Sequence, residues 1–380
     1  MAKIIDKGAD GSGKRWVVRY REPGGRGARQ REKSFDRKRD AVDFATRVEH
    51  DKRTQVYIDP DAGKVTLRVF VQEWLETISV SDGTWESYER IWRLHVLPQL
   101  GRKLLSQVTA ADIEKLYNLW RAQGAEPNTI ESRRIALSSA FTHAARHKRI
   151  ATNPAKEALA PEHHIVPVDE RALPSLEEVS AIAESIGPRL GPAIWMMASC
   201  GLRIGETLGL SSQDFDTGML RLRRQVVRTN ARGGRYAARY APLKHRKEGE
   251  WRDVPLPESA FPLAPYFPIL SESETIPYPD LLRKSWNRAI RRLGMRPYTP
   301  HDLRHKWATV TLTNGVSIHE VSRWLGHRSI KVTVDRYGHL TQDGRERCRQ
   351  VVSAVYADHV PSGLRPARTC AAPGAELVLG

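Results

Sequence analysis

The sequence has little of what several classes of protein require. Only three cysteines, Cys200, Cys348 and Cys370, occur among its 380 residues, too few and too widely spaced for a disulfide framework or a four-thiolate metal site. Its apolar runs, such as 193–200, are far shorter than the ~20 residues that cross a membrane. The chain does not begin with an apolar segment and a small-residue cleavage site, as a secretory signal peptide would. These absences predict a cytoplasmic protein with no membrane association.

The chain also has fewer acidic than basic residues. The chain carries 61 Lys and Arg against 44 Asp and Glu, which gives a formal net charge of +17 and a pI near 10.0. Residues 221–252 alone hold 11 Lys and Arg and only 2 Glu. The hydrophobic share of 40% is enough for ordinary cores and too high for a disordered chain. This composition indicates a folded protein with a polyanionic partner.

The first 60 residues combine strand signals with a helix signal. Apolar and basic residues alternate over 15–21, a glycine-rich turn follows, and a second strand signal covers 30–35. Residues 36–52 carry apolar side chains at helical spacing. The pattern predicts a β-hairpin on a helix, and its charge density favours a DNA-binding surface over a merely solvated domain. The basic side chains expected at that surface are Arg15, Arg19 and Arg21.

Residues 64–160 have a helical pattern throughout. Four segments carry apolar residues three or four apart, and Thr109 with Asp112 has the spacing of a capping box. The expected helices cover 65–77, 84–96, 109–123 and 128–149. Three prolines then predict a linker over 161–174.

Residues 175–357 combine helices with short strands. Ser175 and Glu178 form a second capping-box pattern at the start of a helix, and helices resume after a proline-rich stretch. The expected strands cover 219–228, 236–242 and 251–256. Residues 358–380 are rich in Ala, Pro and Gly and predict a loose tail. The chain is therefore expected to be a multidomain, mainly α protein with small β-sheets, whose third domain is α+β.

Two apparent ligand motifs are incomplete. Residues 8–14 have the spacing of a phosphate-binding Walker loop, but Arg15 replaces the hydroxyl residue that holds magnesium, and a strand signal follows instead of a helix. His301 and His305 stand four apart, as a zinc pair does, but no third ligand accompanies them. We therefore expect no nucleotide, no metal and no other cofactor.

Five short fragments carry residues that are suited to catalysis. In chain order they are GLRIGE at 201–206, the loop at Lys244, HDLRH at 301–305, LGH at 325–327, and Tyr337. Each fragment alone has an ordinary structural explanation, such as a helix cap or a polar surface. A helical bundle with polar surface residues does not explain why arginines, histidines and a tyrosine all fall at element boundaries or on one helix face.

Helical spacing brings part of this set together. His301, Arg304 and His305 follow the i, i+3, i+4 pattern and therefore share one helix face. The next helix should begin after Ser317 and end at Gly326, which leaves the following histidine at its C-terminus.

In their order and spacing, these fragments resemble the motifs of the tyrosine recombinase (phage integrase) family. GLRIGE, a lysine on a basic strand turn, HDLRH, LGH and a tyrosine ten residues later follow that family's order. The resemblance covers nearly the whole chain and implies an arm-type DNA-binding domain at 1–60, a helical core-binding domain at 64–160 and a catalytic domain at 175–357. It implies site-specific cleavage and rejoining of DNA through a 3′-phosphotyrosyl intermediate, without metal or ATP, to integrate or excise a mobile element.

The resemblance also implies a role for individual residues. Arg203 and Arg304 would hold the non-bridging oxygens of the scissile phosphate, which suits guanidinium groups because they stay charged and can bind two oxygens at once. Tyr337 would be the nucleophile. His301 would help to remove its proton, and His327 would donate a hydrogen bond to the phosphate or to the tyrosine oxygen.

Three further residues complete the implied site. Lys244 would protonate the departing 5′-oxygen, although Lys247 remains an alternative from the sequence. Glu206 would orient Arg203, and His305 would have a supporting role.

Double-stranded attachment-site DNA is the implied partner, and the implied assembly is a tetramer on DNA that exchanges strands through a Holliday junction at the nucleoid. An excisionase or a host DNA-bending protein would be an accessory partner. The expected DNA contacts in the catalytic domain are Arg223, Arg224, Arg228 and Arg246. Two alternatives stay open: a type IB-like topoisomerase with the same chemistry, and a DNA-binding regulator whose catalytic set is inert.

Overall fold

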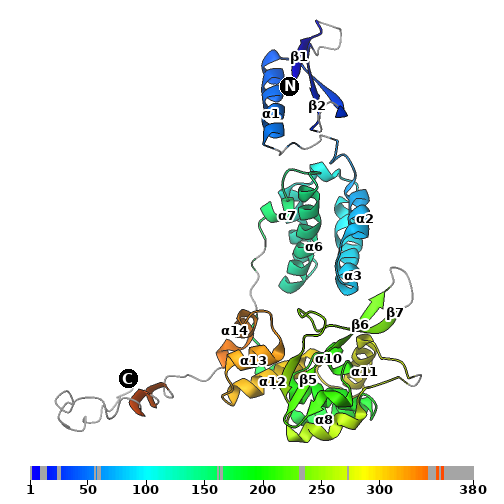
Figure 1. Ribbon diagram of the computed structural model, residues 1–380, viewed down its shortest axis with the longest axis vertical. Helices are drawn as coiled ribbons and strands as arrows, with labels where there is room; N and C mark the ends of the chain where they lie inside the picture. Colours follow the sequence, from blue (N-terminus) through cyan, green and yellow to red (C-terminus); the bar gives the residue numbers. More distant parts are fainter. Residues whose placement is uncertain are drawn as a thin grey trace, which may run out of the picture. The chain divides into compact units, whose positions relative to one another are not determined.

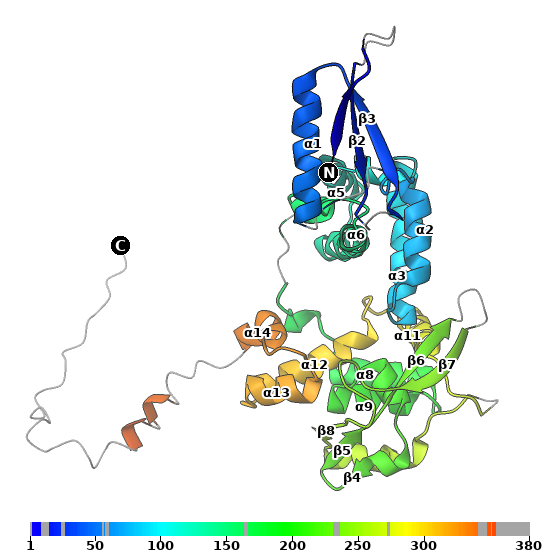
Figure 2. The same cartoon turned by 45° about the horizontal axis from the view of Figure 1, so that its top comes forward.

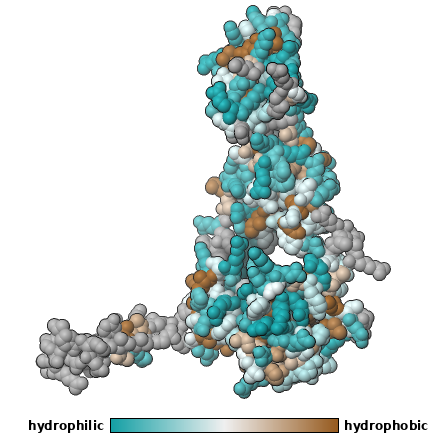
Figure 3. Space-filling model, viewed as in Figure 1, coloured by the Kyte–Doolittle hydropathy of each residue, from teal (hydrophilic) through white to brown (hydrophobic). Residues whose placement is uncertain are grey.

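The chain divides into two compact units, Met1–His164 and Ile165–Gly380. The computed structural model describes residues 2–8, 15–23, 27–54, 57, 61–160, 162, 166–230, 236–271, 274–340, 348–350 and 352–354. The tail expected at 358–380 lies outside these residues. Within them, no helix is long and apolar enough to span a membrane. Figures 1 and 2 show the elements of both units, and Figure 3 shows mainly hydrophilic surface with small hydrophobic patches on each.

The first unit begins with a three-stranded antiparallel sheet that has a helix on one face (Figure 2). β2 (Trp16–Arg21) is the central strand between β1 (Lys3–Asp6) and β3 (Gln30–Phe35), and α1 (Lys38–Arg53) packs on all three. Alternate strand residues such as the buried Val18 meet the apolar stripe of α1 in a small core. The predicted hairpin and helix are confirmed, whereas β1 is an additional edge strand that the sequence did not reveal.

A helical bundle forms the rest of the first unit. Its helices are α2 (Leu67–Thr77), α3 (Asp82–Ile91), α4 (Leu97–Leu100), α5 (Ala110–Ala122), α6 (Pro127–Arg146) and α7 (Pro154–Glu157). The four predicted helices are present, with a π-helical turn Trp92–Val96 continuing α3, and Thr109 forms the predicted capping box with Asp112. A core that includes the fully buried Trp74 and Trp120 holds the bundle together.

The second unit combines helices with two small antiparallel sheets. The helices are α8 (Leu176–Ile186), α9 (Gly191–Cys200), α10 (Ile204–Leu208), α11 (Pro279–Arg292), α12 (Pro300–Thr313), α13 (Ile318–Leu325) and α14 (Lys331–Tyr337). One sheet contains β4 (Phe215–Asp216), β5 (Met219–Leu222) and β8 (Arg252–Pro255), and the other contains β6 (Gln225–Asn230) and β7 (Tyr236–Ala241). The predicted capping box of Ser175 and Glu178 starts α8.

The prediction of one strand over 219–228 is wrong. β5 and β6 are separate strands in different sheets, with Arg223 and Arg224 between them. Both arginines form ion pairs with the buried carboxylate of Asp214. The alternation of apolar and basic residues ends at Leu222, and the consecutive polar residues 223–225 mark the break, but the sequence does not show that the chain changes sheets there.

Two apolar cores organise the second unit. The larger core joins α8, α9 and α11 to the sheets. The smaller packs α12, α13 and α14 around residues that include Trp307, Leu325 and Tyr337. The three helices that carry HDLRH, LGH and the tyrosine therefore form one packed module.

Candidate active site

The GLRIGE motif presents an arginine at a sharp turn between two helices. α9 ends at Cys200, Gly201 adopts the left-handed conformation with φ 64°, and α10 begins directly after Arg203. A Cβ at Gly201 would also collide with the Trp307 indole, so both the backbone angle and the space require glycine. The turn leaves the Arg203 side chain 24% exposed.

Glu206 is completely buried and accepts hydrogen bonds from two arginines. Arg203 donates Nη1–H to Oε1 at 2.8 Å and its main-chain N–H to Oε2 at 3.0 Å. Arg252, in β8, donates Nη1–H to Oε1 at 3.2 Å and Nη2–H to Oε2 at 2.8 Å. Burial raises the pKa of Glu206, but Arg252 and Arg203 outweigh that effect and lower the pKa to about 2. Glu206 is therefore charged at neutral pH.

Arg304, buried in α12, joins two other motifs. Its Nη1 donates to the Gly201 carbonyl at 2.7 Å, and its Nη2 donates to the Leu325 carbonyl. Burial and repulsion by Arg203 lower the pKa of Arg304 to about 9, although Glu206 acts in the opposite direction. The charged guanidinium is disfavoured mainly because burial removes its hydration, and Glu206 compensates this only in part.

Helices α12 and α13 bring three histidines to the same place. His301 and His305 share one face of α12, as their spacing predicts, with ring centroids 4.7 Å apart. α13 ends at Gly326 in the left-handed conformation, so His327 follows its C-terminus as predicted. His327 Nδ1 lies 2.8 Å from Thr333 Oγ1, which fixes the orientation of the ring.

All three histidines are uncharged near neutral pH. Burial and the positive charges of Arg304 and Arg203 lower the pKa values of His301 and His327 to about 3. Burial and a neighbouring arginine lower the pKa of His305 to about 4. An anion bound among these groups would raise all three pKa values, because it favours the imidazolium form.

Tyr337 ends α14 with its side chain in the site. Its residue is 2% exposed, and its hydroxyl oxygen lies 2.5 Å from His305 Nδ1. Burial raises the pKa of Tyr337 to about 12, although Arg304 and Arg336 oppose the shift. From the resemblance we expected His301 to assist this hydroxyl, but the structure places His305 on it.

The β7–β8 loop brings Lys244 to the edge of this cluster. Buried Leu243 directly precedes Lys244 in this loop, and Lys244 is exposed. His245 has a left-handed backbone with φ 66°, and its pKa is lowered by partial burial, by Lys244 and by two arginines that include Arg203. The charge of Arg203 acts on His245, so this turn lies within electrostatic range of Arg203. Sequence reasoning did not single out His245.

The segment before α8 contacts the chain on both sides of Tyr337. The main-chain N–H of Val168 donates to the Arg336 carbonyl at 3.0 Å. His339 Nε2 lies 3.0 Å from the Val168 carbonyl oxygen. Val168 also packs against the small core that contains Tyr337. The end of α14 is thus held by a second segment of chain.

Most basic residues predicted to contact DNA have a partner within the protein. The pairs are Arg15 with Asp6, Arg19 with Glu32, Arg21 with the Ala28 carbonyl, Arg223 and Arg224 with Asp214, and Arg228 with Asp280. Arg246 is half-buried in the loop that follows Lys244. Apart from those at buried Asp214 and the partly buried pair of Arg228 and Asp280, these are surface contacts of little net energy, so they do not prevent the guanidinium groups from turning to a phosphate.

Sequence reasoning missed Arg252, which is 4% exposed. The available signal was the period-2 pattern of β8, in which Arg252 and Val254 are the buried positions. A charged residue at an inward strand position indicates a buried ion pair, but the sequence does not identify its partner. No group of three or more His, Cys, Asp or Glu within the described ranges could hold a metal ion.

Charge in the site is unbalanced. Among the described residues, Arg203, Arg252 and Arg304 all act on the buried carboxylate of Glu206, and the nearby histidines are uncharged. Arg336 and Asp302 act on His305 with opposite signs, so two positive charges around Glu206 remain without a counterion. An anion that carries one negative charge at rest and two in its transition state, as an attacked phosphodiester does, fits this surplus.

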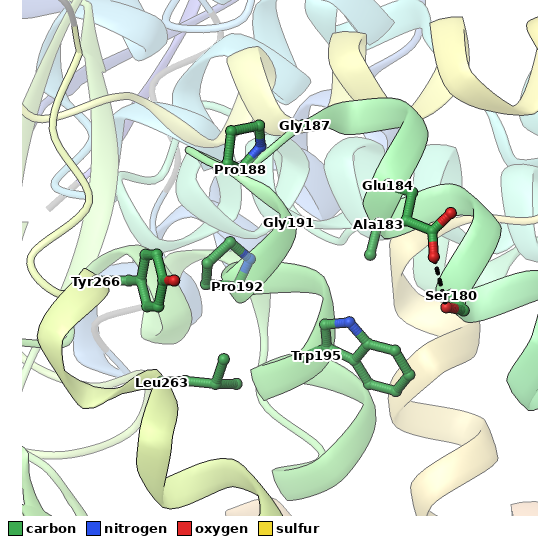
Figure 4. Close-up of a pocket in the computed structure, with 10 residues that line it drawn as sticks. All are labelled: Ser180, Ala183, Glu184, Gly187, Pro188, Gly191, Pro192, Trp195, Leu263 and Tyr266. Carbon is green, nitrogen blue, oxygen red and sulfur yellow. Dashed lines mark hydrogen bonds between the residues drawn. The ribbon is translucent and has the colours of Figure 1, made fainter.

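A cavity of about 410 Å³ in the same unit shares no residue with this cluster. It lies between α8, α9 and the 3-10 segment Glu258–Tyr266, where Trp195, Leu263 and Tyr266 supply much of its lining (Figure 4). Its one charged side chain, Glu184, accepts a hydrogen bond from Ser180 at 3.1 Å. The cavity lacks the convergent cations that an anionic substrate needs.

Comparison with known proteins identifies the class of enzyme to which this arrangement belongs. A model of the phage integrase family matches residues 168–343, and a model of the N-terminal SAM-like domain of phage integrases matches residues 66–121. Together the two matches cover more than half of the chain. The chain belongs to the phage integrase family of tyrosine recombinases.

Individual relatives and solved structures of this family are also similar to the chain. The chain is 27% identical over 322 residues to a tyrosine recombinase XerC-like protein of Caldanaerobacter subterraneus subsp. tengcongensis, over 74% of this chain and 81% of the relative. It resembles the Tn1549 transposon integrase in complex with transposon right end DNA, with a TM-score of 0.59, 18% identity and coverage of 76% and 100%. It also resembles a lambda integrase tetramer bound to a Holliday junction, with a TM-score of 0.53, 17% identity and coverage of 88% and 94%. These structures confirm the expected fold, and the protein is a site-specific tyrosine recombinase.

Proposed function

We propose that this recombinase cuts and rejoins DNA at attachment sites through a bond between Tyr337 and a 3′-phosphate, and so integrates or excises a mobile element. The observation that carries the assignment is the position of Tyr337, whose buried hydroxyl lies 2.5 Å from His305 Nδ1 in the module that also contains Arg304. A tyrosine with this environment has the proton acceptor and the cationic surroundings that an attacking oxygen needs.

The arginines supply the binding site for the scissile phosphate. Arg203, directly before α10, and Arg304, in α12, would hold it, and their surplus charge matches the negative charge that develops on the non-bridging oxygens. His327, oriented by Thr333, donates a further hydrogen bond. Because these groups are held in place before DNA binds, little reorganisation is needed in the transition state.

Proton transfer accompanies the attack. The Tyr337 oxygen forms a bond to phosphorus while the bond from phosphorus to the 5′-oxygen breaks, and the tyrosine proton passes to a histidine. His305 is placed to accept it, with His301 beside it. In the reverse step, a 5′-hydroxyl of the exchanged strand attacks the phosphotyrosine and restores both the diester and the tyrosine.

The departing 5′-oxygen needs a proton of its own. We choose Lys244 over Lys247 as the donor because Lys244 is next to His245. The charge of Arg203 lowers the pKa of His245, so this part of the loop lies within electrostatic range of Arg203. A lysine ammonium group carries N–H donors and no acceptor, so Lys244 can supply the proton to this oxygen.

DNA is the partner along most of the chain. We assign 1–60 to arm-type sites through Arg15, Arg19 and Arg21, 64–160 to core sites, 161–174 to a linker whose Val168 packs on the second unit, and 175–357 to catalysis. Arg223, Arg224, Arg228 and Arg246 would contact the duplex near the catalytic unit.

A tetramer on DNA is supported by the lambda integrase tetramer on a Holliday junction, and an excisionase or host DNA-bending protein is the accessory partner. The site of action is the nucleoid in the cytoplasm.

A nicked suicide duplex that carries a core site tests the proposal directly. The protein is incubated with it in EDTA and without ATP, and SDS-resistant protein–DNA adducts are measured. We expect an adduct with the native protein and none with Tyr337→Phe. An adduct that persists in the variant would show that another tyrosine is the nucleophile.

Adduct formation, together with assays of DNA relaxation and strand exchange, separates the integrase from the regulator and the topoisomerase. If the protein binds a cognate site and forms no adduct, an inert DNA-binding regulator is favoured. If it forms the Tyr337 adduct and relaxes supercoiled DNA but exchanges no strands between two site-bearing duplexes, a topoisomerase is favoured. Recombinant products from two labelled duplexes support the integrase.

A further inference from the structure

Arg252 connects the GLRIGE motif to the LGH motif, although it belongs to neither. Its guanidinium donates to both oxygens of Glu206, and the same two oxygens accept from Arg203. Each oxygen of Glu206 is therefore shared between the two arginines. Any shift of Arg252 changes the position of the carboxylate that holds Arg203.

On its other side, Arg252 lies against Gly326. A Cβ built on Gly326 would lie 2.3 Å from Arg252 Nη1 and 3.0 Å from its Cζ, so the guanidinium occupies the space that a side chain would need. Gly326 has φ 64° and ends α13. The turn that directs His327 into the site is thus packed on the same guanidinium that holds Glu206.

A purely stabilising role does not explain this arrangement. Buried ion pairs are weak sources of stability, because desolvation cancels much of their attraction. Here the cost is greater, since Arg252 is a third cation near Arg203 and Arg304 and contributes to the lowered pKa of Arg304. Arg252 Nε is also buried with no hydrogen-bond partner in the structure. An apolar side chain at this inward position of β8 would avoid these costs.

We propose that Arg252 is a positioning residue of the recombinase, which sets Arg203 through Glu206 and sets His327 through Gly326. The inference rests on the roles proposed above for Arg203 and His327. It predicts that loss of Arg252 slows the chemical step while DNA binding is retained, because Arg252 is 4% exposed and is not available to contact the duplex.

Three single variants test the proposal on the nicked suicide duplex. Arg252→Met removes the guanidinium and keeps an unbranched side chain, whereas Arg252→Lys keeps the charge. Arg292→Met removes an exposed arginine of α11 that donates to the Ser185 carbonyl, and it serves as the control. We expect adduct formation to slow about 10- to 100-fold in Arg252→Met, because small misplacements of catalytic groups have effects of this size. We expect partial rescue in Arg252→Lys, no change in Arg292→Met, and DNA affinity within about threefold of the native value throughout.

A double-variant cycle tests whether the effect passes through Glu206. If it does, Arg252→Met adds little to the defect of Glu206→Gln, and the two changes are strongly non-additive. Fully additive defects would overturn the pathway through Glu206. Thermal unfolding of each variant shows whether it is folded, and only rates from folded protein are compared.

The pH profile supplies a readout that general loss of packing would not change. Glu206 is faced by Arg203 from the start of α10, Arg252 from β8 and Arg304 from α12. When Arg252 is lost, the effect of burial is opposed less and the pKa of Glu206 rises, so protonation at acidic pH releases Arg203. We expect adduct formation by Arg252→Met to fall between pH 7 and pH 5 more steeply than that of the native protein.

The possible failures are distinguishable. If the native protein and Arg292→Met form no Tyr337-dependent adduct, the proposed function is wrong. If they form it and folded Arg252→Met reacts at the native rate with a native pH profile, the function stands and the inference about Arg252 is overturned.

Discussion

The hydroxyl oxygen of Tyr337 lies 2.5 Å from Nδ1 of His305, although 32 residues separate them in the chain. The contact joins α12 to α14 inside the smaller core of the second unit. It places a neutral imidazole, with a pKa lowered to about 4 by burial and a neighbouring arginine, against a tyrosine whose pKa is raised to about 12 by burial. Tyr337, the proposed nucleophile, is therefore protonated in the free protein, and its proton has an acceptor in place.

This contact predicts that His305 matters more than His301 for activation of the tyrosine. We expect His305→Ala to slow adduct formation on the suicide duplex about 100-fold or more, since a general base contributes roughly 10²–10⁴ in rate. His301→Ala, which leaves the contact to Tyr337 intact, should have the smaller effect. The opposite order of the two rates would return the role of base to His301.

Gly326 is predicted to tolerate substitution worse than another glycine with the same backbone conformation. Gly294 has φ 62° with nothing near its missing Cβ, whereas Gly326 has φ 64° with Arg252 in that space. We expect Gly294→Ala to lower the free energy of unfolding by about 1 kcal/mol through backbone strain. Gly326→Ala should cost about 2–4 kcal/mol, because overpacking adds to the strain. Urea unfolding of both variants measures the difference, and equal losses would contradict the contact with Arg252.

The lowered histidine pKa values predict a stability that falls in mild acid. In the folded protein the pKa is about 4 for His305 and about 3 for His327, whereas an unfolded histidine titrates near 6.5. Between these values the unfolded chain binds more protons, so stability is full above pH ~6.5 and is lost as pH falls toward the folded pKa values. We expect the Tm of the free protein to be lower at pH 5 than at pH 7.5.

A histidine variant checks the origin of this pH dependence. His327→Gln cannot titrate and should make the fall in Tm between pH 7.5 and pH 5 shallower than in the native protein. Phosphodiester DNA should have a related effect, since a bound anion raises the pKa values of the site histidines. An unchanged slope in the variant would place the pH dependence elsewhere.

The contact between His339 and Val168 predicts a positioning effect on Tyr337, the proposed nucleophile. His339 Nε2 lies 3.0 Å from the Val168 carbonyl oxygen, and His339 is two residues beyond Tyr337. We expect His339→Ala to slow adduct formation several-fold with little change in DNA affinity, because α14 loses a restraint near its end. His339→Gln carries an amide nitrogen where Nε2 lies and should keep most of the activity. Equal rates for the two variants and the native protein would show that the contact is dispensable.

The sequence by itself determined the local features of the site. The helical period places His301, Arg304 and His305 on one face, and Ser317 and Gly326 mark the ends of the next helix because a side-chain cap and a left-handed backbone are local requirements. Short-range pattern was also enough for the longer helices of the first unit, although it did not predict the one-turn helices α4 and α7. All of these depend on residues within a few positions of one another.

Only the tertiary structure decided which groups meet across the fold. The choice of His305 over His301 as the partner of Tyr337 depends on how α14 packs on α12. The pairing of Arg252 with Glu206 depends on where β8 lies relative to α10, 46 residues away in the chain. The bend at Arg223 depends on the buried carboxylate of Asp214. Such contacts are set by the packing and charge balance of distant segments, which the alternation of residues along one segment does not encode.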